Sequence, residues 1–447
     1  MNTVKRIIDR LSTLGLMCFV CLQLMFTYHI VQAQEGPVSN NVELLGHLEY
    51  PSGANDIWGY TDGTGKEYAL IGIIPGGTAV VDVTDPTNPT EVAFIPGPPS
   101  VWRDIRTHLN FAYVTTEGSG AGEGLQIIDL TDPENAFLTA TFDGTFTTAH
   151  NLHIDNGFAY VVGTVGPALG MHVLDLSVPD NPVEVGRYSD LYVHDVYVRN
   201  DLAYASAIGN GSLEILDISD KSNIVTLASV PSPDATVHNA WTTEDGQFVL
   251  TTDETLDGHL RIWDVSNLSN ITQVAEYESR DQLIIHNVTV REDYAYISYY
   301  IDGLRVVDLS DPTNPGEVGF YDTFPAESRN PFDGDWGVYP FAPSGNIYVS
   351  DLSTGLYILD FSEGVRSGGV SGVITDKSTG MPIAAAEVNF AEAGKTFTSD
   401  VAGVYAIRTN EGHHTVTATA FGFLPETAGV DVVAGPGAAE LNISLEV

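Results

Sequence analysis

The sequence predicts an all-β protein: a seven-bladed β-propeller closed by an N-terminal strand and followed by a small β-sandwich. Two observations carry this prediction. A unit of four short strands recurs through most of the chain, and this period breaks off near residue 362, where shorter alternating segments begin. Of the 447 residues, 43% are hydrophobic, which is enough to build packed cores.

The repeat is marked by an apolar run that ends in an aspartate and a turn. An earlier strand in each unit begins with a polar pair such as His238-Asn239, and a Tyr-rich or β-branched strand lies between the two. A fourth strand follows the aspartate, so each unit holds four strands separated by Gly, Pro, Asn and Asp turns. Seven such units of about 45 residues predict seven blades. The aspartates are Asp82, Asp129, Asp175, Asp217, Asp264, Asp308 and Asp360.

The ends of the repeat predict how the ring closes. Residues 42–50 resemble a fourth strand with no unit in front of it, and the last unit ends at Phe361 without a fourth strand of its own. Pairing of these two segments would close the ring and leave no exposed sheet edge. The propeller is therefore predicted at residues 42–361.

The N-terminus has the pattern of a secretory signal peptide. Residues 1–33 combine a basic start, an apolar run and small residues up to Ala33. The alternative is an uncleaved membrane anchor, which the polar Gln23 disfavours. Cleavage predicts a secreted, extracellular or cell-surface protein with no transmembrane span in the mature chain. Both cysteines would be removed, and residues 34–41 would form an N-terminal linker.

The C-terminal part has a different organisation. Residues 362–369 are rich in Gly and Ser and are predicted as a flexible linker. Residues 370–447 contain short alternating segments separated by Gly turns, which predict a β-sandwich.

The charge restricts the class of partner. The chain has 59 acidic and 18 basic residues and a net charge of −41, which disfavours a nucleic-acid partner. The recurring aspartates admit two interpretations: they bind calcium, or each accepts backbone N–H groups and fixes its own turn. The second is favoured because the sequence lacks a calcium loop dense in ligands.

The motifs resemble three known families or repeats. Copies such as AVVDVTDP and VVDLSDP resemble the LVIVD repeat, and the order of VWRDIRTH, AHNLHID, VHNAWT and DWGVYPF is similar to the choice-of-anchor B family of exported bacterial proteins. The segments GVITD, TGMPI and GVY resemble a carboxypeptidase regulatory-like (transthyretin-like) domain. These resemblances imply an exported or surface propeller and no catalytic residues. Because similar tails are grouped with carbohydrate-binding-like folds, they add a glycan to the candidate ligands.

One candidate site is the leading position of the first strand of each unit. The first strand lies nearest the propeller axis, so these side chains are expected to converge at one end of the channel. The position holds Asn55, Arg103, His150, His194, His238, His286 and Asp335. The four histidines beside Asp335 predict a site for Zn, Cu or Fe. Alternatively, the imidazoles hydrogen-bond to the neighbouring blade and hold the blades together.

A second candidate site lies on the opposite face of the same strands, which is expected to be the wetter one. Aromatic side chains beside amides and carboxylates suit the binding of sugars or peptides. The alternative is aromatic packing between blades. The candidate residues are Trp58, Arg106, His153, Tyr197 and Trp241.

The function predicted from the sequence is that of an exported, non-catalytic binding or scaffold protein for a protein, peptide or glycan. No hydrolase motif and no phosphate-binding loop occurs, so no catalytic residue is predicted. The alternative is a metal-dependent enzyme that uses the histidines at the channel mouth. A third hypothesis is a structural role in which calcium stiffens the acidic loops. The candidate cofactors are thus calcium or a transition metal.

Overall fold

The structure is a computed structural model that describes residues 39–447 except 167–168, 281, 325–329 and 363. The predicted signal peptide and both cysteines lie outside the described residues. No helix among the described residues is long and apolar enough to cross a membrane.

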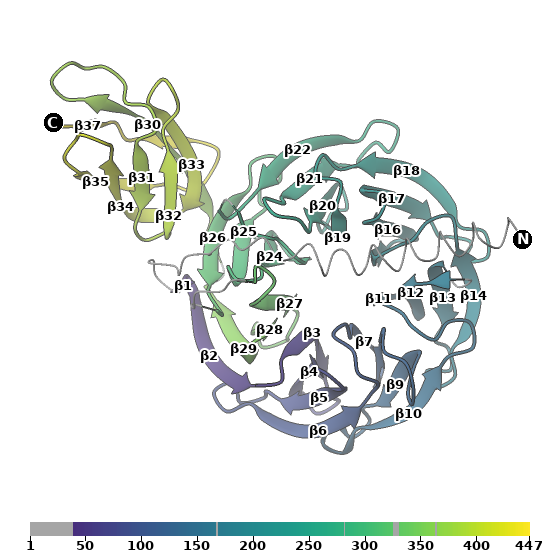
Figure 1. Ribbon diagram of the computed structural model, residues 1–447. Coiled ribbons are helices and arrows are strands. Elements are labelled where there is room, and N and C mark those ends of the chain that lie inside the picture. The colour runs from purple at the N-terminus through teal and green to yellow at the C-terminus, as the bar shows by residue number, and fades with distance from the viewer. Residues whose placement is uncertain (1–38, 167–168, 281, 325–329, 363) are drawn as a thin grey trace, which may run out of the picture.

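The first four blades follow one another along the chain as antiparallel sheets around a central axis (Figure 1). Blade 1 consists of β3 (Ala54–Thr61), β4 (Glu67–Ile73), β5 (Gly77–Asp82) and β6 (Thr90–Pro96). Blade 2 consists of β7 (Ile105–His108), β8 (Phe111–Val114), β9 (Leu125–Asp129), the short 3-10 turn η1 (Pro133–Asn135) and β10 (Phe137–Phe142). Blade 3 consists of β11 (Asn151–Asp155), β12 (Phe158–Thr164), β13 (Gly170–Asp175) and β14 (Val183–Tyr188). Blade 4 consists of β15 (Asp195–Arg199), β16 (Leu202–Ala207), β17 (Ser212–Asp217) and β18 (Val225–Pro231).

Three more blades complete the ring. Blade 5 consists of β19 (Val237–Thr242), β20 (Phe248–Asp253), β21 (Leu260–Asp264) and β22 (Thr272–Tyr277). Blade 6 consists of β23 (Val288–Arg291), β24 (Tyr294–Ser298), β25 (Leu304–Asp308), β26 (Gly316–Tyr321) and the short edge strand β1 (Ser39–Asn40). Blade 7 consists of β27 (Asp335–Tyr339), β28 (Ile347–Asp351), β29 (Gly355–Phe361) and β2 (Val42–Glu49). The described residues thus form seven blades, and the predicted fold class is confirmed.

Closure of the ring is confirmed as well. Strand β2 pairs antiparallel with β29, so that Val42 lies opposite Phe361 and Glu49 lies opposite Gly355. Figure 1 shows these two strands side by side, although β2 is near the start of the propeller sequence and β29 is at its end. The residues just before β2 were expected to be a linker, but β1 pairs with β26 of blade 6.

The apolar runs form strands that are covered on both faces. In β5 every residue before Asp82 is buried, because the neighbouring blades pack against both sides of the sheet. The aspartates that end these runs fix the turns that follow. In six units the aspartate Oδ1 accepts the backbone N–H two residues further on, at 2.7 to 3.0 Å. These bonds support the turn interpretation of the repeat aspartates.

The C-terminal residues form two facing sheets, as predicted for a β-sandwich. One sheet contains β30 (Ser367–Asp376), β33 (Val404–Asn410), β36 (Ala438–Glu440) and β37 (Ile443–Leu445). The other contains β31 (Glu387–Phe390), β32 (Lys395–Thr398), β34 (Gly412–Thr419) and β35 (Glu426–Val432). Val370 and Phe390 lie in the apolar core of this sandwich.

The sandwich is held against blade 6, outside the ring (Figure 1). The expected flexible linker at 362–369 ends early, because β30 already begins at Ser367. Asp308 accepts the Ser367 N–H at 2.9 Å and binds the Arg366 guanidinium at 3.2 Å. Lys395 of β32 reaches Glu317 of β26 at 2.9 Å, and both side chains are nearly inaccessible to solvent. These contacts hold the start of the sandwich against blade 6.

Candidate functional site

Four imidazoles meet at the channel end where the innermost strands begin. His150, His194 and His286 lie just before β11, β15 and β23, and His238 lies in β19. The ring centroids are 4.1 Å apart for His150 and His194, 4.6 Å for His194 and His238, and 4.5 Å for His238 and His286. The predicted convergence of the histidines therefore occurs.

Asp335 does not join the histidines, so this part of the predicted metal set is wrong. The register irregularity between Asp335 and Gly337 in β27 matches the one between Val237 and Asn239 in β19, so Trp336, and not Asp335, corresponds to His238 and lies beside the imidazoles. The Trp336 ring lies 4.7 Å from that of His286. The Asp335 carboxyl is buried instead near Asp351, and burial, with that second carboxylate, raises its pKa well above the usual range. Asn55 and Arg103 also turn away, toward the carbonyls of Val101 and Pro98.

Two overlapping groups at this site have the composition of a metal site. The ligand atoms of His150, His194 and His238 all lie within 4.8 Å of one another, and those of His238, Glu254 and His286 do so too. Imidazole nitrogen suits Zn, Cu, Fe and Ni. His238 belongs to both groups.

Contacts behind the imidazoles orient them. His150 Nδ1 is 2.7 Å from Glu117 Oε1, and His286 Nδ1 is 2.6 Å from the Trp336 carbonyl oxygen. In each case Nε2 remains available on the other side of the ring. Such contacts from a carboxylate or a carbonyl to the second nitrogen are typical of histidines that bind metals.

Most of the imidazoles are neutral near pH 7. Burial lowers the pKa of His238 and of His286 to about 3. Burial also lowers the pKa of His194, and the neighbouring imidazoles lower it further. Burial acts on His150 in the same direction, but the hydrogen bond and charge of Glu117 outweigh it and raise its pKa. A neutral imidazole keeps the lone pair that a metal ion requires.

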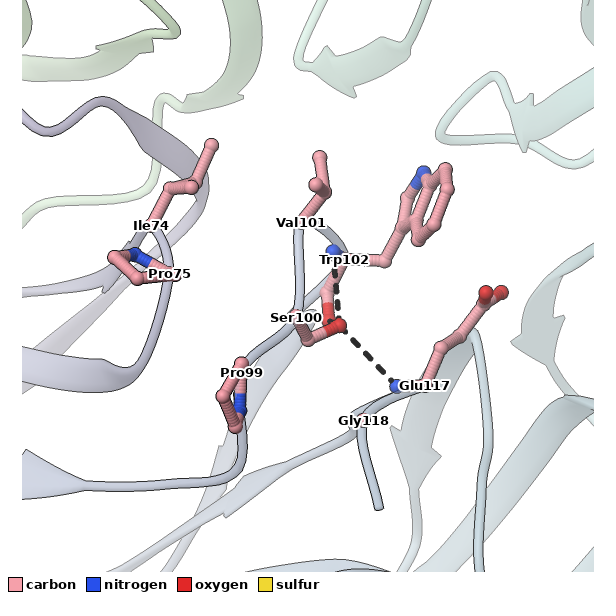
Figure 2. A pocket seen from close by; sticks show the side chains of 8 residues that line it. All are labelled: Ile74, Pro75, Pro99, Ser100, Val101, Trp102, Glu117 and Gly118. Carbon is pink, nitrogen blue, oxygen red and sulfur yellow. Dashed lines mark hydrogen bonds between the residues drawn. The ribbon is translucent and has the colours of Figure 1, made fainter. Parts of the chain in front are cut away.

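A shallow pocket of about 370 Å³ is lined by Trp102 and Glu117 together with residues of blades 1 and 2 (Figure 2). Its apolar lining comes from the β4–β5 connection and from the loop before β7, and Glu117 and Gly118 follow β8. Ser100 shapes the pocket, because its Oγ accepts the Trp102 N–H at 3.2 Å and the Glu117 N–H at 3.4 Å. Trp102 and Glu117 both line this pocket and contact His150. The apolar lining residues are Ile74, Pro75, Pro99, Val101 and Trp102.

The residues of the second predicted site lie close together, but this face of the strands is not the more solvent-exposed one. His153, Tyr197 and Trp241 are each no more than 9% exposed. Tyr197 packs on Trp241 at 4.2 Å between ring centroids, and the Arg106 guanidinium lies 4.1 Å from the Trp58 ring centroid. Phe341 fills the remaining space between Trp58 and Trp241. The expected exposure is thus wrong, because inward side chains from several blades cover one another where the strands converge.

On the innermost strands, the residue directly after the leading position links adjacent blades. Asp56 accepts the N–H of Ile105 in the next blade at 2.9 Å, and Asn239 accepts that of Val288 at 3.0 Å. The Asp195 carboxylate accepts a hydrogen bond from the Asn151 side-chain amide at 2.7 Å. Burial raises the pKa of Asp195 to about 6. The clamp that was suggested for the histidines is therefore made largely by this Asp/Asn position, although His286 also bonds across to blade 7.

Sequence reasoning missed several residues of the histidine site. Trp102 and Trp336 each lie one residue from a leading position that was identified, so an allowance for a bulge would have found Trp336. Glu117 and Glu254 lie just after the second strands of blades 2 and 5. No repeating pattern marks these two glutamates, and only the folded ring brings them to the imidazoles.

Family models match two parts of the chain. The LVIVD repeat matches residues 65–94, 148–190, 192–231 and 285–323, and the carboxypeptidase regulatory-like domain matches residues 369–446. The chain therefore contains LVIVD repeats and a carboxypeptidase regulatory-like domain. The finer assignment to choice-of-anchor B is not among these matches and stays a prediction.

A solved β-propeller domain resembles the ring. The β-propeller domain of Cps50 (Swd1) from Myceliophteria thermophila matches with 13% identity and a TM-score of 0.50, covering 72% of this chain and 100% of that chain. The computationally designed protein Ika8 matches with 8% identity and a TM-score of 0.48, covering 71% of this chain and 99% of that chain. At this identity the Cps50 match shows the fold alone. No curated protein matches the chain.

Proposed function

We propose that the protein is an exported, non-catalytic binding scaffold that binds its ligand at the channel mouth where the pocket lies. The observation that carries this proposal is an apolar pocket (Figure 2) in which the lining residues Trp102 and Glu117 both contact His150. Binding sites are concave and mostly apolar, with a few polar groups that fix orientation. The other predicted binding face is packed with its own aromatic rings and offers less open surface.

The lining of the pocket favours a peptide or protein segment over a glycan. Five apolar residues surround only two polar side chains, Ser100 and Glu117. A sugar has many hydroxyl groups that need hydrogen-bond partners, whereas an apolar side chain needs none. Val101 is 40% exposed, so this face remains accessible to a partner. The negative charge of the chain favours a ligand segment that carries a basic group beside its apolar one.

A displayed peptide library tests this proposal. We expect the protein to enrich peptides with an apolar residue next to a basic one, and Trp102→Ala to weaken their binding by roughly 10-fold or more. Leu109→Ala is the matched control, because Leu109 is 68% exposed in the β7–β8 turn at the other end of blade 2. Fluorescence titration of the enriched peptides measures each dissociation constant.

Two results would contradict the proposed function. One is equal binding of the peptides to the Trp102→Ala and Leu109→Ala proteins. The other is selective binding on a glycan array that Trp102→Ala abolishes, which would assign the pocket to sugars. Export is part of the same proposal and is supported by the signal-peptide pattern of residues 1–33.

A further inference from the structure

We propose that His150, His194 and His238 bind one divalent transition-metal ion, such as Zn²⁺, at the mouth of the propeller channel. Their ligand atoms already lie within 4.8 Å of one another. Nitrogens that share one tetrahedral Zn²⁺ at about 2.0–2.1 Å are roughly 3.3 Å apart. Small rotations of the three rings would therefore bring them to a common ion.

Unpaired nitrogens at the cluster point to a ligand. His194 Nε2 and His238 Nδ1 are buried and have no hydrogen-bond partner among the described residues. Buried polar atoms are nearly always paired, and each exception calls for an explanation. A metal ion at this position would accept the lone pairs that nothing else in the described chain uses.

The surroundings fit such an ion. Glu117 holds His150 through Nδ1, which directs Nε2 away from the carboxylate. Glu117 also lines the pocket, so the pocket provides a route by which an ion or a small ligand could approach (Figure 2). Three protein ligands with an open neighbouring space is the arrangement of zinc sites that keep one position for an exogenous ligand.

The second group, His238, Glu254 and His286, competes for the same imidazole. A neutral imidazole donates its lone pair to one metal ion, so His238 serves one group at a time. The carboxylate of the second group already has protein contacts. Glu254 Oε2 lies 3.6 Å from His238 Nε2, and its Oε1 accepts the Tyr300 hydroxyl at 2.6 Å. Of the two unpaired nitrogens, His194 Nε2 belongs to the first group alone, and the first group is therefore assigned to the metal.

The test uses the untagged protein, stripped with a chelator and titrated with Co²⁺ or Zn²⁺. We expect one ion per chain, a visible Co²⁺ spectrum typical of nitrogen ligands, and release of Co²⁺ by Zn²⁺. His194→Ala should weaken binding by roughly 100-fold or more. His413→Ala is the matched control, because His413 is exposed on the sandwich and paired with Asp431. It should bind like the unaltered protein.

Further variants keep the inference falsifiable. Thermal unfolding shows whether His194→Ala still folds, and His194→Phe keeps the ring contacts without a ligand nitrogen if it does not. Glu254→Gln should still bind one ion. The inference is overturned if the unaltered protein binds much less than one ion, or if His194→Ala binds as tightly as His413→Ala. It is also overturned if Glu254→Gln, and not the His194 variants, loses the ion. None of these measurements depends on the proposed peptide binding.

Discussion

His153 shows how burial decides the behaviour of one side chain. The imidazole packs among rings, with centroids 5.0 Å from Tyr197 and 5.8 Å from Trp241. Burial, and then the positive charge of Arg106, lowers its pKa to about 3. It is therefore neutral in the folded protein at pH values where it would be protonated in the unfolded chain. The sequence pattern identified this residue correctly as part of a cluster, but its protonation follows from packing alone.

The pH dependence of stability tests this residue. Between pH 6.5 and about 3 the unfolded imidazole binds a proton that the folded one does not, so His153 makes the folded state lose stability as the pH falls. The loss is at most about 1.4 kcal/mol per pH unit. We expect His153→Phe to remove it, so urea unfolding at pH 7 and pH 5 should show a smaller decrease than in the unaltered protein. Parallel decreases would contradict the buried, neutral state.

Strand β2 shows how one element closes the ring. It carries a register irregularity between Leu44 and Gly46, where the turn of blade 1 packs over it. A Cβ on Gly46 would lie 2.0 Å from the carbonyl oxygen of Pro86, so only glycine fits this contact. The hydrophobic pattern of residues 42–50 was sufficient to predict the pairing. The close approach to blade 1 depends on how adjacent blades pack.

Substitution of Gly46 tests the closure. We expect Gly46→Val to lower the free energy of unfolding by about 1–3 kcal/mol, because the new side chain must displace the Pro86 turn. Leu44→Val on the same strand is the control, because Leu44 is 41% exposed, and it should change stability by about 0.5 kcal/mol at most. Urea unfolding measures both. Equal effects of the two substitutions would show that the contact with Pro86 does not constrain the strand.

At the scale of the whole molecule, the sandwich and the propeller are joined by buried polar contacts. Asp308 ends β25 and holds the turn of its own repeat through the Ser310 N–H at 3.0 Å. The same carboxylate accepts the Ser367 N–H and binds Arg366. Burial acts to raise the pKa of Asp308, but the N–H groups of Ser367 and Ser310 outweigh it and hold the pKa below its usual range. One repeat aspartate thus also joins the sandwich to the propeller.

Substitution of Asp308 tests this connection. We expect Asp308→Ala to lower the free energy of unfolding by about 2–3 kcal/mol, because several hydrogen bonds to a buried charge are lost. Asp293→Ala is the control, since the Asp293 side chain is 57% exposed and forms a surface ion pair with Arg366, and it should cost about 1 kcal/mol or less. Calorimetry at pH 7 measures both. In the unaltered protein the contribution of Asp308 is present above pH 4 and is lost below it, as the folded carboxylate becomes protonated. Similar effects of the two substitutions would mean that Asp308 does not join the two parts.

The sequence by itself determined the number of blades, the closing strand, the sandwich and the meeting of four histidines. Those features follow from strand periodicity and turn residues, which act over a few neighbouring positions. Only the tertiary structure decided that Trp336, and not Asp335, lies beside His286, because the strand pairing aligns Trp336 with His238. Packing between blades also decided that the face with Trp241 is buried, and that Glu117 and Glu254 reach the imidazoles. Such contacts join residues far apart in the chain, and no local pattern records them.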